Sequence, residues 1–150
     1  MPDLSVISRR DCEFIDITQK INELVPQDMK YGICHVFCSH TTAGLTINEN
    51  ADPDVKHDLL KKLDSMMPKQ ESYYQHCEGN SAAHLKSSLF GVSLAVPVRN
   101  GKLWLGTWQG VYLYLSTSGT VEFAEIYTLP GTEPQLAVAY RYCQRYAEQT

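Results

Sequence analysis

Two polar segments of the chain collect the side-chain types that do chemistry. The first covers residues 37–50 and holds a histidine, three threonine hydroxyls, a glycine, a carboxylate and two asparagine amides. The second covers residues 76–86 and is the only other segment in which His, Glu and Asn surround a glycine. Packing of an apolar core does not require such mixtures. We therefore expect the two segments to meet in space and to form one site.

The histidines of these segments have the chemistry of metal ligands. Neutral imidazoles that converge at about 2 Å bind a divalent ion, and a catalytic centre usually adds a carboxylate and an open water position. His40, His76 and His84 would supply the imidazoles, with Glu49 or Glu78 as fourth ligand or as proton acceptor. None of their spacings is a zinc signature, and a single histidine is more often a hydrogen-bonded surface residue. The prediction of a zinc or magnesium centre therefore depends on the three rings lying together.

Further polar residues are expected to contact a small phosphorylated substrate. Lys86 would neutralise a phosphate group. The segment at residues 107–110 is either a bulge that packs an indole into the core or the mouth of the pocket. His35 and His57 lack such surroundings, and we expect them to be structural and solvated, respectively. The predicted substrate-binding residues are Thr41, Thr42, Asn48, Asn80, Trp108 and Gln109.

Alternating hydrophobicity predicts the strands that position the site. The expected strands cover residues 4–8, 13–17, 31–39, 92–98, 103–106, 111–116 and 121–129. The third of these leaves His40 at a strand exit. The Asn100-Gly101 pair predicts a tight hairpin turn, and the strands that follow are expected to form an antiparallel meander with one face covered by helices.

Helical spacing of apolar residues predicts the elements that carry the chain away from the site and back. The expected helices cover residues 19–25, 53–67, 81–90 and 136–146. Thr18 would cap the first, and Asp52 followed by Pro53 would begin the second. Asn80 or Ser81 would cap the third, with Gly91 left-handed at its end. A loop at residues 69–80 joins the second and third helices and is expected to wrap over the site.

Length and composition exclude several function classes. With 150 residues, 43% of them hydrophobic, the chain is expected to form one domain with its own core. The net charge of -4 argues against a nucleic-acid partner. The first residues lack the apolar run of a signal peptide, and no segment is long enough to span a membrane, so we expect a cytoplasmic protein. Five cysteines without framework spacing are read as reduced thiols.

These motifs resemble the YjbQ-like family, also called the secondary thiamine-phosphate synthase family. The match covers about residues 4–129 in the same order. It rests on the stretch HTTAGLTINENADP at 40–53, on the segment at 76–86, and on LGTWQG at 105–110. The resemblance implies a compact single α+β domain over residues 1–130, with an antiparallel sheet or sandwich core, two to three covering helices, and assembly as a homotrimer. It also implies that His40, His76 and His84 cluster next to Glu49 and Glu78.

Two departures from the family pattern limit what carries over. After its Trp-Gln-Gly motif the family usually has an acidic residue and then Asp, Pro and Arg in a turn, whereas residues 112–119 of this chain are uncharged. A carboxylate that assists the family's chemistry there would be missing here. Residues 131–150 lie beyond the family's usual end, and this helical extension could alter the oligomer.

Three functions are consistent with these residues. The first is a thiamine-phosphate synthase-like transferase that couples hydroxymethylpyrimidine diphosphate to a thiazole phosphate, with His40, Glu49, Glu78 and Lys86 in the catalytic roles. The second is metal-assisted hydrolysis at the same site, in which Glu49 or Glu78 takes a proton from a metal-bound water. The third is a trimeric, non-catalytic protein that binds an anion or metabolite.

Overall fold

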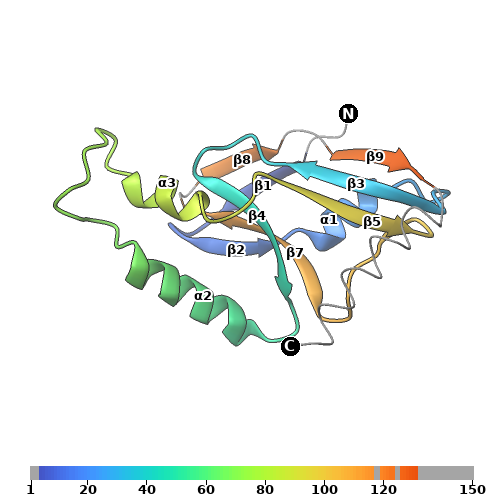
Figure 1. Ribbon diagram of the computed structural model, residues 1–150, viewed down its shortest axis with the longest axis horizontal. Helices are drawn as coiled ribbons and strands as arrows, with labels where there is room; N and C mark the ends of the chain where they lie inside the picture. The colour runs from blue at the N-terminus through green and yellow to red at the C-terminus, as the bar shows by residue number, and fades with distance from the viewer. Residues whose placement is uncertain (1–3, 117–118, 124–125, 132–150) are drawn as a thin grey trace.

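The computed structural model describes residues 4–116, 119–123 and 126–131, shown in Figure 1. The predicted C-terminal helix at 136–146 and most of the expected extension lie outside these residues. In chain order the elements are β1 (Leu4–Ser8), β2 (Glu13–Asp16), α1 (Thr18–Leu24), β3 (Tyr31–Phe37), β4 (Ala43–Glu49), α2 (Pro53–Met66), α3 (Ser81–Ser87), β5 (Ser93–Arg99), β6 (Lys102–Leu103), β7 (Gln109–Leu115), β8 (Gly119–Phe123) and β9 (Ile126–Pro130). In the described ranges no helix is long and apolar enough to cross a membrane.

The strands pair in three antiparallel sheets, with orders β6-β5-β3-β9, β2-β7-β4 and β1-β8. The α+β class with antiparallel sheets and covering helices is therefore confirmed. The predicted meander is wrong, because β7 pairs with the earlier strands β2 and β4 instead of its neighbours in sequence. The strand expected at 121–129 is divided between β8, which pairs with β1, and β9, which pairs with β3. The hairpin turn is confirmed, with positive φ of 51° at Asn100 and 71° at Gly101.

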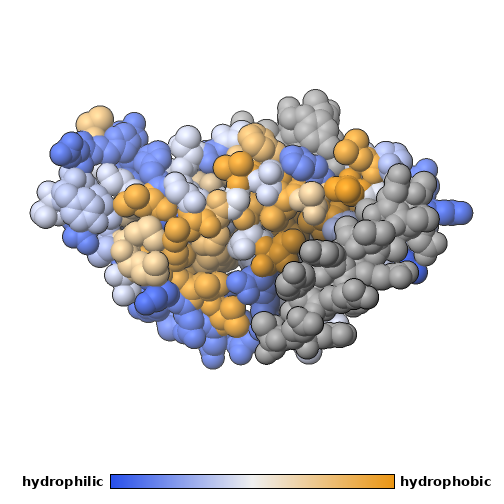
Figure 2. All heavy atoms as spheres, viewed as in Figure 1, coloured by the Kyte–Doolittle hydropathy of each residue, from blue (hydrophilic) through white to orange (hydrophobic). Residues whose placement is uncertain are grey.

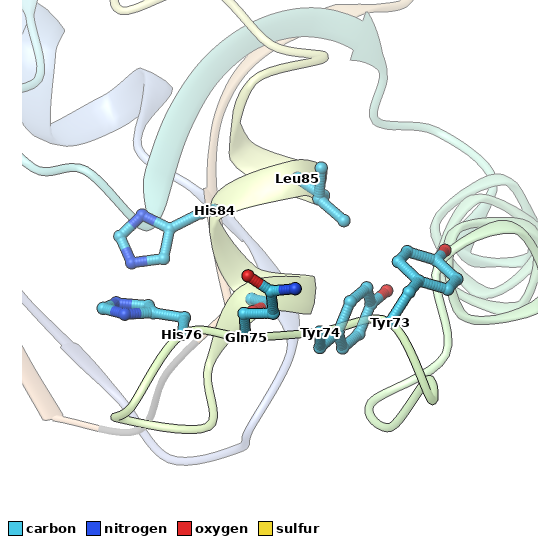
Figure 3. Close-up of a pocket in the computed structure, with 7 residues that line it drawn as sticks. Tyr73, Tyr74, Gln75, His76, His84 and Leu85 are labelled. Atoms are coloured by element: carbon cyan, nitrogen blue, oxygen red, sulfur yellow. The ribbon is translucent and has the colours of Figure 1, made fainter.

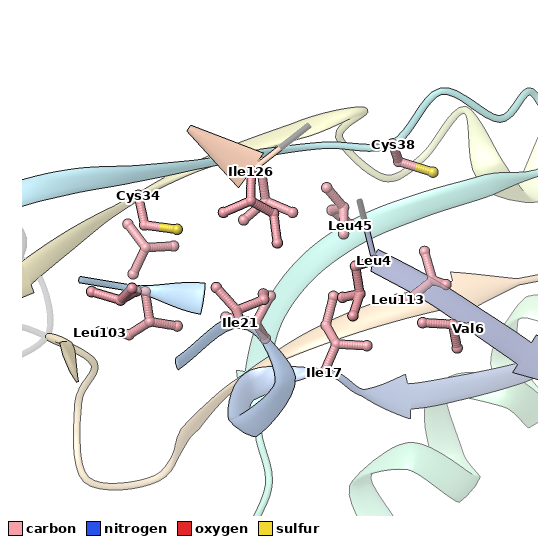
Figure 4. Close-up of a cluster of buried hydrophobic side chains, with 14 of the residues drawn as sticks. Leu4, Val6, Ile17, Ile21, Cys34, Cys38, Leu45, Leu103, Leu113 and Ile126 are labelled. Carbon is pink, nitrogen blue, oxygen red and sulfur yellow. The ribbon is translucent and has the colours of Figure 1, made fainter. Parts of the chain in front are cut away.

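Strand β7 is buried on both faces and joins two hydrophobic cores. Val111, Leu113 and Leu115 point into the main core between the sheets, together with residues of β3, β5 and α1 (Figure 4). Tyr112 and Tyr114 point the other way and pack with Phe14, Phe90 and the apolar side of α2. The alternation of side chains along a strand produces this division. As a result α2 covers the outer face of the β2-β7-β4 sheet (Figure 1).

The helix ends were predicted with mixed success. Asp52 caps α2 as expected, since its carboxylate accepts a hydrogen bond from the Asp54 N–H at 2.9 Å. Thr18 does not cap α1; Ile17 holds that position, and the Thr18 hydroxyl instead accepts from the Val111 N–H at 2.8 Å. Helix α3 ends at Ser87 instead of Phe90. Gly91 is not left-handed, and its carbonyl accepts a hydrogen bond from β4 at 2.7 Å.

Strand β4 was not predicted. It shows that half of the first polar segment is a strand of the sheet and not a continuous part of a site. It covers Ala43–Glu49, with buried residues in its first half and half-buried ones in its second. It pairs along its whole length with β7, from Ala43 opposite Leu115 to Glu49 opposite Gln109. The mixed polar sequence hid this strand, because the polar side chains lie where the sheet is only partly covered.

Candidate functional site

Strand β4 separates the residues that the sequence places in one segment. Seven residues at about 3.3 Å each put its two ends roughly 20 Å apart. His40, Thr41 and Thr42 precede the strand, and we call this the His40 end. Asn48 and Glu49 close it, and we call that the Glu49 end. The expectation that Glu49 lies beside His40 is therefore wrong within one chain.

The His40 end is held against α3. The backbone carbonyl of Thr41 accepts a hydrogen bond from the Ser87 hydroxyl at 2.7 Å, and the same hydroxyl bonds to the carbonyl of His84 at 3.0 Å. The Nδ1 atom of His40 accepts from the backbone N–H of Thr42 at 3.3 Å and lies 3.1 Å from its hydroxyl. These contacts place the His40 segment one helical turn from His84.

His76 and His84 come together as the sequence predicts. Their ring centroids are 5.1 Å apart in an edge-to-face arrangement, His76 from the loop at residues 69–80 and His84 from α3. Glu78 accompanies them, with its carboxylate 3.8 Å from His76 Nε2. Asn80 donates from its amide to the same carboxylate at 3.1 Å. Two of the three predicted histidines and one of the two predicted carboxylates thus share a site.

The histidine pair opens onto a cavity of about 460 Å³. Figure 3 shows the two rings facing each other on one side, with Tyr73 and Tyr74 on the other. The tyrosine rings touch edge to face at 5.0 Å, and the Tyr74 hydroxyl donates to the carbonyl of Pro68 at 3.2 Å. Burial, followed by the neighbouring Tyr73, raises the pKa of Tyr74.

Sequence reasoning placed this loop over the site but did not single out its residues. The lining that it missed consists of Tyr73, Tyr74, Gln75, Ser81 and Leu85. A signal was present, because two adjacent tyrosines in an otherwise polar loop without periodicity indicate rings that cover something rather than a core element.

At the Glu49 end the side chains of Asn48 and Gln109 bond to backbone atoms. The Asn48 side-chain oxygen accepts from the Glu49 N–H at 2.8 Å, and the Gln109 side chain accepts from the Gly106 N–H at 2.9 Å. The Trp108 carbonyl accepts from the Asn50 N–H at 2.8 Å, while the Trp108 residue is 64% exposed. The bulge interpretation that packs this indole into the core is therefore wrong. None of these residues lines the histidine cavity.

Lys86 lies on the side of α3 away from His84. Residues two positions apart on a helix are separated by about 200° around its axis, so they cannot share a face. The Lys86 side chain is 3% exposed and forms an ion pair with Asp64 of α2. It does not line the histidine cavity, which argues against the predicted contact with a phosphate there.

The described residues do not assemble a complete metal centre. Among them, no three or more His, Cys, Asp or Glu side chains are placed to hold one ion. The donor set of one chain around His76 and His84 therefore falls short of the three protein ligands of a typical catalytic zinc site. The metal centre stays a prediction.

Comparison with known proteins identifies the family. The sequence model of the UPF0047 protein YjbQ-like family matches residues 3–116. The chain belongs to the UPF0047 family. It is 50% identical to the UPF0047 protein YugU of Bacillus subtilis over 106 residues, which cover 70% of this chain and 80% of that protein. A UPF0047 protein of Methanocaldococcus jannaschii is 48% identical over 101 residues, covering 67% and 72% of the two chains.

Solved structures of similar proteins share the fold. A YjbQ/UPF0047-family crystal structure from Clostridium acetobutylicum superposes with a TM-score of 0.79 at 45% identity, covering 85% of this chain and 100% of that one. A conserved hypothetical protein from Thermus thermophilus gives a TM-score of 0.77 at 36% identity, covering 87% and 100%. The UPF0047 match ends at residue 116, so the histidine cavity lies within it and β8 and β9 follow it.

Proposed function

We propose that this UPF0047 protein is a thiamine-phosphate synthase-like transferase acting in the cavity at His76 and His84. In the reaction, the bond between the pyrimidine methylene carbon and the diphosphate oxygen breaks, and the thiazole nitrogen forms a new bond to that carbon. The diphosphate leaves with the bonding electrons. The site must therefore bind an aromatic ring and stabilise negative charge on the leaving group.

The observation that carries this proposal is the contact between the two imidazoles at the cavity wall, 5.1 Å apart. Each imidazole presents a ring N–H donor at neutral pH, and in the protonated form presents two. Two such rings at one wall suit the oxygens of a diphosphate, whose charge grows as the carbon–oxygen bond breaks. Glu78 lies 3.8 Å from His76 Nε2 and is placed to orient that ring toward the cavity.

The opposite wall suits the ring of the substrate. Tyr73 is 68% exposed and stands against Tyr74 at the cavity, so an aromatic ring can stack on an accessible face. The volume of about 460 Å³ falls within the roughly 300–1,000 Å³ of small-molecule sites. Ring binding on one side and diphosphate binding on the other would place the reacting carbon between them.

The test is formation of thiamine phosphate from the two precursors by purified full-length protein with added divalent metal. We expect turnover by the wild-type chain and a loss of at least about 100-fold in His76→Ala. His57→Asn is the matched control, because His57 lies on α2, is 65% exposed and bonds to its neighbour Asp58, away from the cavity lining. Absence of product in the wild type overturns the proposal. Hydrolysis of phosphate esters without the thiazole partner would assign the cavity to hydrolysis instead.

Metal dependence is a separate prediction. Removal of divalent ions with a chelator should lower the transferase rate by at least about tenfold, and zinc or magnesium should restore it, because a cation neutralises diphosphate charge directly. Direct metal analysis of His84→Ala should show less bound ion than His57→Asn. Full activity after exhaustive chelation would remove the metal from the proposal and leave the imidazoles as the diphosphate site.

A further inference from the structure

A second cavity, of about 780 Å³, lies on the other side of α3 and shares no lining residue with the histidine cavity. Its walls come from the β1–β2 connection, α2, the loop before α3, α3 itself and the end of β7. Cys12, Asp64, Asn80 and Lys86 are among its lining residues. The proposed transferase reaction takes place in the histidine cavity, and only Glu78, which lies 3.8 Å from His76, also lines this second cavity.

Three polar groups surround the sulfur of Cys12. The Lys86 ammonium lies at 3.9 Å, the Tyr114 hydroxyl donates from 3.7 Å, and the Ser116 hydroxyl lies at 3.4 Å. Lys86 is 3% exposed and Tyr114 is fully buried, so both are fixed by packing. Burial is the main cause that raises the pKa of Tyr114, and its hydroxyl stays a proton donor at neutral pH. The sulfur of Cys12 thus lies among an ammonium and two hydroxyls at the cavity wall, and the thiolate is the form of cysteine that attacks electrophiles.

Two other groups at this cavity lack part of their hydrogen bonding. The Asn80 side-chain oxygen is buried and has no partner among the described residues. An ammonium has three N–H donors, and the partners of Lys86 in the described part of the chain are Asp64 and the weak acceptor Cys12. Buried polar atoms of this kind normally find a partner. A ligand with both an acceptor and a donor would satisfy them once the Asn80 amide turns toward the cavity, because its oxygen is buried in the absence of a ligand.

The charges around the cavity are of both signs. Arg10, Lys69 and Lys86 contribute cations, and Asp11, Asp64 and Glu78 contribute carboxylates. A simple anion would meet the carboxylates, and a simple cation would meet the lysines. Lys86 pairs with Asp64, and Lys69 with Asp11, so cations and carboxylates alternate along the wall. An amino-acid zwitterion, with a carboxylate and an ammonium group, matches this mixed lining.

We propose that Cys12 is a site of thiol–disulfide exchange with a small peptide disulfide that carries amino-acid zwitterions. The Cys12 thiolate attacks one sulfur of the incoming disulfide, whose S–S bond breaks, and the other sulfur leaves as a thiolate. The proton lost by Cys12 is matched by the proton that the departing thiolate takes up. Cys12 is oxidised to a mixed disulfide while one half of the reagent is reduced, so no further oxidant is needed.

The other described cysteines provide internal comparisons. Cys77 is exposed, and no described residue forms a hydrogen bond or ion pair with it. Cys34 and Cys38 are buried, which raises the pKa of both thiols, that of Cys34 to about 11. Exposure alone favours reaction at Cys77, whereas the surroundings described above favour Cys12. Cys143 lies outside the described residues and is followed separately by peptide mapping.

The test measures mixed-disulfide formation at each cysteine by mass spectrometry of the full-length protein at neutral pH. Glutathione disulfide is the zwitterionic probe, and hydroxyethyl disulfide is the neutral one. With glutathione disulfide, Cys12 should react at least about tenfold faster than Cys77, with a rate that saturates as the reagent concentration rises. With the neutral probe the ratio of the Cys12 and Cys77 rates should fall by at least about threefold.

Two variants separate binding from folding. Asn80→Ala should reduce the preference of Cys12 for glutathione disulfide and leave its rate with hydroxyethyl disulfide unchanged. Lys86→Met should slow Cys12 with both probes, and it is interpreted only where its thermal unfolding matches the wild type; otherwise Asn80→Ala decides. Equal rates at Cys12 and Cys77, or the same Cys12 to Cys77 ratio for both probes, overturn the proposal.

Discussion

The two ends of β4 carry similar residue types but differ in what those residues bond to. At the Glu49 end, Asn48, Gln109 and Trp108 contribute hydrogen bonds that hold backbone atoms of the two paired strands and their connections. At the His40 end, backbone contacts through Ser87 fix α3, and α3 and its preceding loop present side chains to two cavities. Polar composition alone therefore does not mark a site. A site needs polar groups whose bonding capacity is left free for a ligand.

The largest expected effect is on the transferase rate, which should depend on the residues near the His40 end of β4 and not on those at the Glu49 end. His84→Ala should lower the rate of thiamine-phosphate formation by at least about 100-fold, because it removes one of the two rings that face the proposed diphosphate position. Glu49→Gln should change the rate by less than about threefold, since that carboxylate lies at the far end of β4. Steady-state rates of both variants under identical metal conditions provide the measurement. Equal losses would show that the two ends meet, for example across a subunit boundary.

The two ends of β4 should also differ in their contribution to the oligomer interface. The resemblance to the family predicts a homotrimer, and Leu85, Leu89 and Val92 are 43%, 59% and 55% exposed on and after α3. Figure 2 shows hydrophobic side chains gathered over this part of the molecule, bordered by hydrophilic ones. Apolar area of this kind favours association. Light scattering should give about 51 kDa, three times the chain mass of 16.9 kDa.

Leu89→Asp tests which end contributes to that assembly. A charge in the apolar patch should shift the measured mass toward one chain. Trp108→Ala, at the Glu49 end, should leave the mass of the oligomer unchanged. A wild-type mass near that of a single chain, about 17 kDa, or dissociation by Trp108→Ala alone, would contradict the assignment of the interface to the α3 side.

The next largest expected effect is on stability, at the close packing of β4 against the residues at and after the end of α3. A Cβ atom at Gly44 would lie 2.6 Å from the Cβ atom of Phe90 and 3.3 Å from the carbonyl oxygen of Ser87. Neither neighbour is a flexible side-chain end, so Gly44→Ala should destabilise the fold by about 1–3 kcal/mol. Gly106→Ala meets only the movable Gln109 amide, at 3.3 Å, and should cost less than about 0.5 kcal/mol. Thermal unfolding at one protein concentration compares them, and equal shifts would show that the α3 contact is not tight.

The sequence predicts the elements that depend on local chemistry. Helix α2 follows from the Asp52 cap and Pro53, and the hairpin turn follows from the ability of Asn and Gly to adopt positive φ. The meeting of His76 with His84 was also predicted, from the polar residue types of their segment and from a loop long enough to bring the chain back to the site. These features are decided by residues close together in the chain.

The features that could not be predicted depend on distant contacts. Strand β4 is recognisable only once β7 lies beside it, because its second half is polar. The ion pair of Lys86 with Asp64 and the contacts of Cys12 join residues from separate elements, so neither local pattern nor spacing indicates them. The meander was wrong for the same reason, since β1, β2 and β3 pair with strands from the far end of the chain.

The smallest expected effect is at Gln109. Its side-chain oxygen accepts the Gly106 N–H on the exposed surface, so Gln109→Ala should lower the free energy of unfolding by no more than about 1 kcal/mol. The transferase rate should stay within about twofold of the wild type, because Gln109 does not line the histidine cavity. Chemical denaturation and the precursor-coupling assay on the same preparation measure both quantities. A large loss of rate with unchanged stability would indicate that Gln109 contacts the substrate, and therefore that the Glu49 end also binds a ligand.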